Sequence, residues 1–254
     1  MKKRFTLIAS FLLAAAICTA QEAESRILVG IGHSGISQKI LNCFIKSVTD
    51  AGADYIVFET YPESDEVVKE YIDRVDALII PGKGGNDTTG RSKYDNKLIS
   101  EAHNQGKPVL GVCFGHQRIN QTLGGKTVKV AEYYPGSNIC HKKKVNGYNV
   151  LLYSEAHNIR IEKDSKMYAI FGSEDLMVNS SHFWSCYRIG EGLKVTATAD
   201  DGVVEAIEGD KLLGVQFHPE VMYAELGNQR FLGIFKYIIN EAAEAKAARE
   251  KAGE

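Results

Sequence analysis

An alternation of short apolar runs with helical segments over residues 26–123 constrains the fold of this chain more than any other feature. Runs typical of buried strands occupy Arg26–Gly30, Ala53–Thr60, Ala77–Ile80 and Pro108–Val112. Segments with helical spacing of apolar residues follow them, at Gln38–Ala51, Val67–Val75, Lys93–Gln105 and 113–123. Strands that alternate with helices form parallel sheets that are covered on both faces. The sequence therefore predicts one α/β domain with a mostly parallel sheet.

The pattern becomes more β-like after residue 144. Short apolar segments separated by turns occur at 148–153, 157–162, 167–171, 193–199, 203–208 and 212–217. They predict antiparallel strands added at one edge of the sheet. A helix is expected over Asn228–Lys251, and the Ala/Glu/Lys-rich residues 241–254 are predicted to be a helical, partly disordered tail.

The first twenty residues have the layout of a bacterial-type secretory signal peptide. Lys2, Lys3 and Arg4 precede an apolar run over 5–17, and Ala20 ends a short stretch of small residues. The run is short for a membrane span. We therefore expect residues 1–20 to be removed, residues 21–240 to form the domain, and the protein to be exported, periplasmic or secreted, with no membrane attachment after cleavage.

Charge and cysteine content exclude several classes of function. The chain has 254 residues with 30 Lys+Arg against 32 Asp+Glu, so it carries no strongly basic field and nucleic acid is not an expected partner. No CxxC pair is present, which argues against zinc ribbons and thioredoxin-type sites. An oxidising compartment would permit a disulfide among Cys43, Cys140 and Cys186, of which the pair of Cys140 with Cys186 is one hypothesis.

A cysteine stands between a predicted buried strand and a predicted helix. Gly111 and Gly115 flank Cys113 at two residues on either side, in the stretch GVCFGHQ. Small neighbours permit the tight turn that presents a nucleophile, and the helix N-terminus favours a thiolate. The N–H of Phe114 would point to where an oxyanion forms. A buried structural cysteine is the alternative interpretation.

A histidine and a glutamate end the last apolar strand, in the stretch GVQFHPE. His218 and Glu220 would point to opposite faces of a straight strand, but Pro219 between them bends the chain. A base must take the thiol proton, and a carboxylate must orient that base. A surface His–Pro turn is the alternative.

A glycine-rich loop follows the predicted strand Ala77–Ile80, at residues 81–87. It would supply a second oxyanion donor, a backbone N–H near Gly82 or Lys83. An ordinary strand–helix turn is the alternative. The loop matches no phosphate-binding motif.

Together these motifs resemble the class I glutamine amidotransferase superfamily over residues 26–240. Between the two motifs the chain resembles the γ-glutamyl hydrolase branch, peptidase family C26, which includes γ-glutamyl-γ-aminobutyrate hydrolases. The matching stretches are His157–Ile159, the VNSSH of residues 178–182 and the DGVVEAIE of residues 201–208. The resemblance implies a flavodoxin-like domain that hydrolyses γ-glutamyl amides and needs no metal or organic cofactor.

Carried over residue by residue, the resemblance implies the following roles. Cys113 is the nucleophile, His218 the general base and acid, and Glu220 the residue that orients it. The oxyanion hole is formed by the N–H of Phe114 and an N–H near Gly82 or Lys83. The glutamyl group of a small-molecule substrate is held by Gln117, Asn179, Ser180, Ser181 and His182.

Other interpretations remain open from the sequence. A glutaminase subunit that delivers ammonia to a partner synthetase would explain the GHQ after Cys113, and a binding protein on the same fold is a third hypothesis. Cys140 and His141, followed by three lysines, are interpreted as a solvated loop rather than a metal or anion site. His182 and Cys186 have the spacing of metal ligands on a helix, but the sequence shows no further ligands. The leaving group and the oligomeric state, including a homodimer, are left open.

Overall fold

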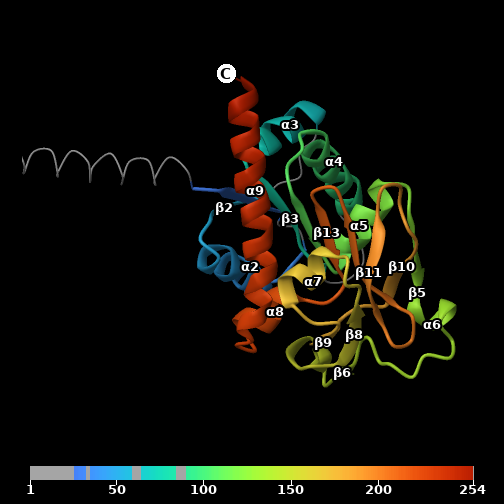
Figure 1. Ribbon diagram of the computed structural model, residues 1–254. Coiled ribbons are helices and arrows are strands. Elements are labelled where there is room, and N and C mark those ends of the chain that lie inside the picture. The colour runs from blue at the N-terminus through green and yellow to red at the C-terminus, as the bar shows by residue number, and fades with distance from the viewer. Residues whose placement is uncertain (1–25, 33–34, 59–63, 84–89, 254) are drawn as a thin grey trace, which may run out of the picture.

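A nine-stranded sheet forms the centre of the molecule (Figure 1). The computed structural model describes residues 26–32, 35–58, 64–83 and 90–253. The strand order is β2-β1-β3-β4-β13-β12-β11-β8-β9. The five parallel strands are β1 (Leu28–Gly32), β2 (Asp54–Phe58), β3 (Ala77–Ile80), β4 (Val109–Val112) and β13 (Leu212–Val215). The predicted fold class is confirmed.

Antiparallel strands extend the sheet beyond β13, at the edge where the sequence predicts them. They are β12 (Val204–Gly209), β11 (Lys194–Ala199), β8 (His157–Ile161) and β9 (Asp175–Val178). A separate ribbon pairs β5 (Lys126–Lys129) with β10 (Trp184–Arg188). β5 carries two lysines and β10 has polar residues on both faces, so neither has an apolar run that would predict a strand.

Helices cover both faces of the sheet (Figure 1). One core lies under α2 (Gln38–Asp50), α7 (Lys166–Phe171), α8 (Pro219–Ala224) and α9 (Leu232–Gly253), with the 3-10 turn η2 (Gln229–Phe231) before α9. The other lies under α3 (Asp65–Asp73), α4 (Arg91–Asn104) and α5 (Phe114–Thr122). The short helix α6 (Val130–Tyr133) follows β5. No helix among the described residues is long and apolar enough to cross a membrane.

The strand expected at 167–171 is wrong, because tertiary contacts make this segment helix α7. The Ser165 side chain accepts the N–H of Tyr168 at 2.9 Å. The buried carboxylate of Glu208 accepts the N–H groups of Lys166 and Met167, each at 2.9 Å. Gly172 then ends the helix in the left-handed conformation, with φ 62°. Three of the unpaired N–H groups at the helix start are thus satisfied, two of them by a carboxylate 41 and 42 residues away in sequence.

The strand expected at 148–153 is also wrong over most of its length. Only Tyr148–Asn149 (β7) pairs, with Lys144–Val145 (β6), across a tight Asn-Gly turn. Val150–Tyr153 is a 3-10 turn, η1. The carbonyl groups of Leu151 and Leu152 accept hydrogen bonds from the segment around Asn179, so this stretch braces a loop instead of extending the sheet.

The C-terminal residues continue helix α9. Ala242 and Ala245 are buried against the domain, and Lys246 pairs with Asp76 at 3.2 Å. Arg249 lies 3.7 Å from the same carboxylate. The structure thus places part of the expected tail, residues 241–254, in contact with the domain. The expected signal peptide, residues 1–20, lies outside the described residues.

Helix α5 packs against the sheet backbone with no side chain between them. A Cβ atom at Gly115 would lie 1.9 Å from the carbonyl oxygen of Ile80, and one at Gly111 would lie 2.5 Å from Gly115. Real Cβ atoms do not approach backbone this closely, so only glycine permits the contact. It brings the start of α5 to the carboxyl ends of β3 and β4.

We predict that Gly115→Ala lowers the free energy of unfolding by at least about 2 kcal/mol, because the new methyl group has to displace backbone. Chemical denaturation measures the loss. Gly136→Ala is the matched control, since a Cβ there meets nothing within 4 Å, and its effect should stay below about 0.5 kcal/mol. Equal stability of the two variants would contradict the close packing.

Candidate active site

Cys113 occupies the sharp turn between β4 and α5. Its backbone has φ 52° and ψ −97°, and its N–H donates to the carbonyl group of Val215 at 2.7 Å. A positive φ is costly for a residue with a side chain, so surrounding contacts must hold it. The thiol is buried and lies at the N-terminus of helix α5. The sharp turn predicted at Cys113 is present, and its role as a nucleophile stays a prediction.

His218 ends the segment after β13, on the strand adjacent to β4. Its Nδ1 lies 2.8 Å from Oε1 of Glu220, which is fully buried. Burial lowers the pKa of His218, but the nearby charges of Glu220 and Cys113 outweigh it and raise the pKa to about 10. The carboxylate of Glu220 therefore favours the protonated imidazole. His218 is the N-cap residue of α8, and Pro219 is the first residue of that helix. The chain therefore turns after His218, and the turn brings the Glu220 side chain back to the imidazole ring.

Gly82, after β3, lies against both reacting side chains. A Cβ atom there would be 2.8 Å from Cε1 of His218 and 3.4 Å from Cβ of Cys113. Phe114 is the first residue of α5, so its N–H has no partner within the helix. Both groups expected for the oxyanion hole, the N–H of Phe114 and an N–H near Gly82 or Lys83, therefore belong to backbone beside Cys113.

Arg91 holds the Gly82 segment in place, which the sequence did not indicate. Its guanidinium is fully buried and donates to the carbonyl oxygens of Pro81 at 2.7 Å and Gly82 at 2.9 Å. Its Nε pairs with Asp95 at 2.7 Å. In a trans peptide the N–H points away from the carbonyl group. The N–H of Lys83 therefore points away from Arg91.

Asn179 has a different role from the one expected. Its side chain is fully buried, accepts the N–H of His218 at 2.8 Å and donates to the carbonyl groups of His218 and Leu152 at 3.1 and 2.9 Å. All of these partners are backbone groups, so Asn179 positions His218 and has no side-chain atom left to hold a substrate in the way expected. Ser180 is likewise fully buried and donates to the carbonyl group of His141 at 2.8 Å.

The remaining expected substrate residues do line a pocket beside Cys113. Gln117 lines it, while its amide nitrogen donates to the carbonyl group of Trp184 at 2.9 Å and to Gln216 at 3.0 Å. The carbonyl oxygen of Ser181 lies 4.0 Å from the Cys113 sulfur. His182 also borders the pocket, but its ring nitrogens face Trp184 and Glu205.

This pocket has a volume of about 580 Å³ and a strongly positive lining. Its charged lining residues are Lys83, Arg118, Lys142 and Lys144, and no carboxylate among the described residues lines it. Phe183 and Trp184 form an exposed aromatic part of the wall. The pocket therefore combines a nucleophile with a field that attracts anions.

Comparison with known proteins agrees with this geometry. The family model for Peptidase C26 matches residues 22–220. The chain belongs to the Peptidase C26 family. This membership makes it a hydrolase of the class I glutamine amidotransferase superfamily, as the motifs predict.

Individual proteins and one solved structure are also similar to this chain. Protein NtpR from Enterococcus hirae is 30% identical over 78% of this chain and 87% of the relative. The glutamine-hydrolyzing GMP synthase of Dictyostelium discoideum is 28% identical over 82% of this chain, which spans 30% of that protein. The crystal structure of a glutamine amidotransferase from Thermotoga maritima superposes with a TM-score of 0.61 at 14% identity, over 86% of this chain and 99% of the other.

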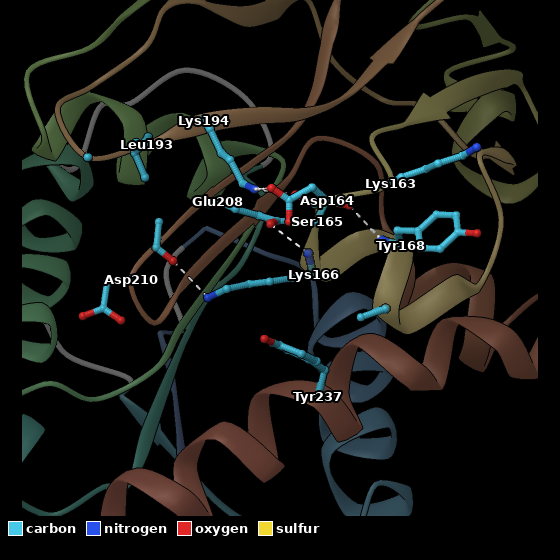
Figure 2. A pocket seen from close by; sticks show the side chains of 13 residues that line it. Lys163, Asp164, Ser165, Lys166, Tyr168, Leu193, Lys194, Glu208, Asp210 and Tyr237 are labelled. Atoms are coloured by element: carbon cyan, nitrogen blue, oxygen red, sulfur yellow. Dashed lines mark hydrogen bonds and ion pairs between the residues drawn. The ribbon is translucent and has the colours of Figure 1, made fainter.

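A second pocket, of about 610 Å³, lies at the end of β13 opposite to the end that leads to His218, and Figure 2 shows the residues that line it. In the C26 fold the reacting groups stand at the carboxyl ends of the parallel strands, whereas this pocket adjoins the turn that leads into β13. Lys166 there donates to the carbonyl group of Gly209 at 2.9 Å, and Lys194 pairs with Asp164. Its lining, in the part of the chain that the structure describes, contains no thiol or histidine, so this pocket is separate from the one beside Cys113.

The four described cysteines are free, so the disulfide hypothesis for Cys140 and Cys186 is wrong. Cys186 is fully buried in β10, and burial raises its thiol pKa, whereas Cys140 is exposed. His116, beside the nucleophile, is fully buried against Gly214, and burial lowers its pKa to about 4. It is a neutral packing residue.

We predict that the imidazole of His218 titrates near pH 10 and that Glu220→Gln moves the midpoint to lower pH. The carboxylate stabilises the charged ring, so its removal disfavours protonation and lowers the pKa. NMR of histidine-labelled protein, with His218→Gln identifying the signal, measures the midpoint. Glu225→Gln, a change in the same segment without contact to the ring, is the control. An unshifted midpoint in Glu220→Gln would refute the pairing.

We predict that Asn179→Ala lowers the free energy of unfolding by about 1–3 kcal/mol, because three buried backbone groups lose their partner. Urea denaturation monitored by circular dichroism measures the change. Asn158→Ala removes a solvent-exposed bond to Asp175 and should cost less than about 0.5 kcal/mol. A neutral Asn179→Ala would show that His218 is held by other contacts.

Proposed function

We propose that the chain hydrolyses γ-glutamyl amide bonds of small molecules through a γ-glutamyl thioester on Cys113. The observation that carries the proposal is the arrangement of Cys113 at a helix N-terminus beside the His218–Glu220 pair, within a C26 hydrolase. The cationic pocket beside Cys113 supports it, because the glutamyl end of such a substrate carries a free α-carboxylate, three carbon atoms away from the reacting γ-carbonyl group.

The proposed reaction proceeds in two acyl transfers. The Cys113 thiolate attacks the γ-carbonyl carbon, and the charge that develops on oxygen is stabilised by the N–H groups of Phe114 and the Gly82–Lys83 segment. The C–N bond breaks as His218 gives its proton to the leaving amine. His218 then takes a proton from water, which attacks the thioester, and glutamate leaves as the C–S bond breaks. Glu220 keeps the imidazole oriented throughout.

We also propose that the protein acts after export. The basic start and apolar run of residues 1–20 support this. N-terminal sequencing of the protein recovered from its native compartment tests it: a mature chain that begins at Gln21 supports export, and one that begins at residue 1 or 2 contradicts it.

We predict that the purified protein releases glutamate from at least one γ-linked substrate other than glutamine. The panel is glutamine, a γ-glutamyl dipeptide, γ-glutamyl-γ-aminobutyrate and a di-γ-glutamate. Cys113→Ala should lower the rate at least about 1,000-fold, since it removes the nucleophile. Cys140→Ala removes an exposed thiol and should retain the rate. Glutamate release that survives in Cys113→Ala would refute the mechanism.

A second function is favoured by the GMP synthase relative: a glutaminase subunit that passes ammonia to a synthetase. The same cysteine chemistry would then act on glutamine, and activity would depend on a partner. Slow hydrolysis of glutamine alone, together with silence on the other γ-glutamyl amides, would support this second function. Turnover of γ-glutamyl-γ-aminobutyrate or a dipeptide without a partner would support the first.

A further inference from the structure

Three histidines and a glutamate converge behind the wall of the cationic pocket. His157 begins β8, Glu205 lies in β12, His182 precedes β10 and His141 precedes β6. All four side chains are more than nine-tenths buried, and their nearest nitrogen and oxygen atoms lie within 4.8 Å of one another. Neither Cys113 nor the His218–Glu220 pair is among them.

The distances in this cluster are too long for hydrogen bonds and suit shared coordination. Oε1 of Glu205 lies 3.5 Å from Nδ1 of His141, 3.6 Å from Nε2 of His157 and 3.4 Å from Nε2 of His182. Hydrogen bonds between such atoms are typically 2.7–3.2 Å long. Metal–ligand bonds of about 2.0–2.2 Å place neighbouring atoms of a tetrahedron about 3.3–3.6 Å apart. The three distances from Oε1 of Glu205 to the histidine nitrogens fall within this range.

The atoms that face the centre have no partner among the described residues. These buried, unpartnered atoms are Nδ1 of His141, Nε2 of His157, Nε2 of His182 and both carboxylate oxygens of Glu205. A buried carboxylate without a donor or cation is strongly unfavourable.

The opposite nitrogen of each ring is held in the manner of a metal ligand. Nε2 of His141 lies 2.9 Å from the Asp201 carboxylate. Nδ1 of His182 lies 3.1 Å from the carbonyl oxygen of Trp184, and Nδ1 of His157 lies 3.2 Å from that of Asn158. A ring that donates one N–H to a carboxylate or carbonyl group directs its other nitrogen at a metal.

We propose that His141, His157, His182 and Glu205 bind a divalent transition-metal ion, and that this ion is zinc. Three imidazoles and one carboxylate are a donor set that suits zinc, and four protein ligands close a tetrahedral structural site. The sequence-based expectation of no metal is thereby revised. The His182–Cys186 spacing is not that of a helix, because Cys186 lies within β10, and His141 is buried instead of solvated.

The position of the site defines its role. The main-chain oxygen of Ser181, next to His182, lies 4.0 Å from the Cys113 sulfur, and the N–H of His182 donates to the carbonyl group of His141 at 3.0 Å. The ion would connect the loop that carries Ser181 and His182 and the loop that carries His141 to the sheet strands β8 and β12. It stabilises the wall of the active-site pocket and takes no part in bond making.

The test is zinc binding by the full chain after treatment with a chelator. We expect one equivalent of zinc per chain, measured by competition with a chromophoric chelator, and a rise in Tm on adding zinc, since an ion that binds only the folded state stabilises it. Glu205→Gln should weaken binding at least about 100-fold, and Asp201→Asn by about 10–100-fold through loss of the bond to His141.

Two control variants locate the ion. Glu208→Gln changes a second buried glutamate of the same strand, whose carboxylate binds the start of α7, and it should keep the affinity for zinc. Cys113→Ala should also keep it, which excludes zinc held by the active-site thiol. Absence of stoichiometric zinc uptake by the unaltered chain, equal affinities of Glu205→Gln and Glu208→Gln, or loss of binding in Cys113→Ala would each overturn the proposal.

A measurement on the unaltered chain covers the case in which Glu205→Gln does not fold. Co²⁺ substituted for zinc should give the intense visible absorption of a tetrahedral ion without a thiolate charge-transfer band. X-ray absorption of the zinc form should then show three imidazole ligands and no sulfur. A sulfur ligand or fewer than two imidazoles would overturn the proposal independently of any variant.

Discussion

The direct packing of helix α5 against the backbone of β3 and β4 is the contact on which the active site depends. Gly115 sits against the carbonyl group of Ile80, and Gly111 sits against Gly115, at separations that no side chain permits. This contact places the N-terminus of α5 at the carboxyl ends of β3 and β4. Cys113 thereby occupies a sharp turn with a positive φ of 52°, and its side chain lies beside Gly82 and His218.

Buried polar side chains then set the positions of the reacting groups. Arg91 holds the carbonyl oxygens of Pro81 and Gly82, and Asn179 holds both backbone groups of His218. Neither side chain needs to touch substrate to matter, because errors of an ångström in such sites cost large factors in rate. In a C26 hydrolase of this kind the rigid parts are thus backbone segments, each held by a side chain from elsewhere in the chain.

Two groups of histidines, each with a buried carboxylate, show opposite shifts of the histidine pKa. His218 faces Glu220 across a short hydrogen bond, and its pKa is raised to about 10. The three histidines around Glu205 stand farther from their carboxylate, and burial lowers the pKa of His141 and His182 and raises that of Glu205 to about 7. The first arrangement fits the proposed transfer of a proton by His218, whereas the second fits the proposed coordination of an ion. The same residue types therefore serve acid–base chemistry in one place and fit metal binding in the other.

The sequence by itself determined the parallel half of the sheet and the turns that carry Cys113 and His218, because both depend on local signals. Apolar runs bounded by glycine mark β3 and β4, and the neighbours of Cys113 and His218 carry the turn chemistry of their motifs. Tertiary structure alone decided that 167–171 is helical, since the carboxylate of Glu208 binds its first N–H groups. It also decided that Asn179 positions His218, and that His141, His157, His182 and Glu205 meet. These contacts join residues tens of positions apart, and their geometry is set by how strands and loops pack, which no local pattern encodes.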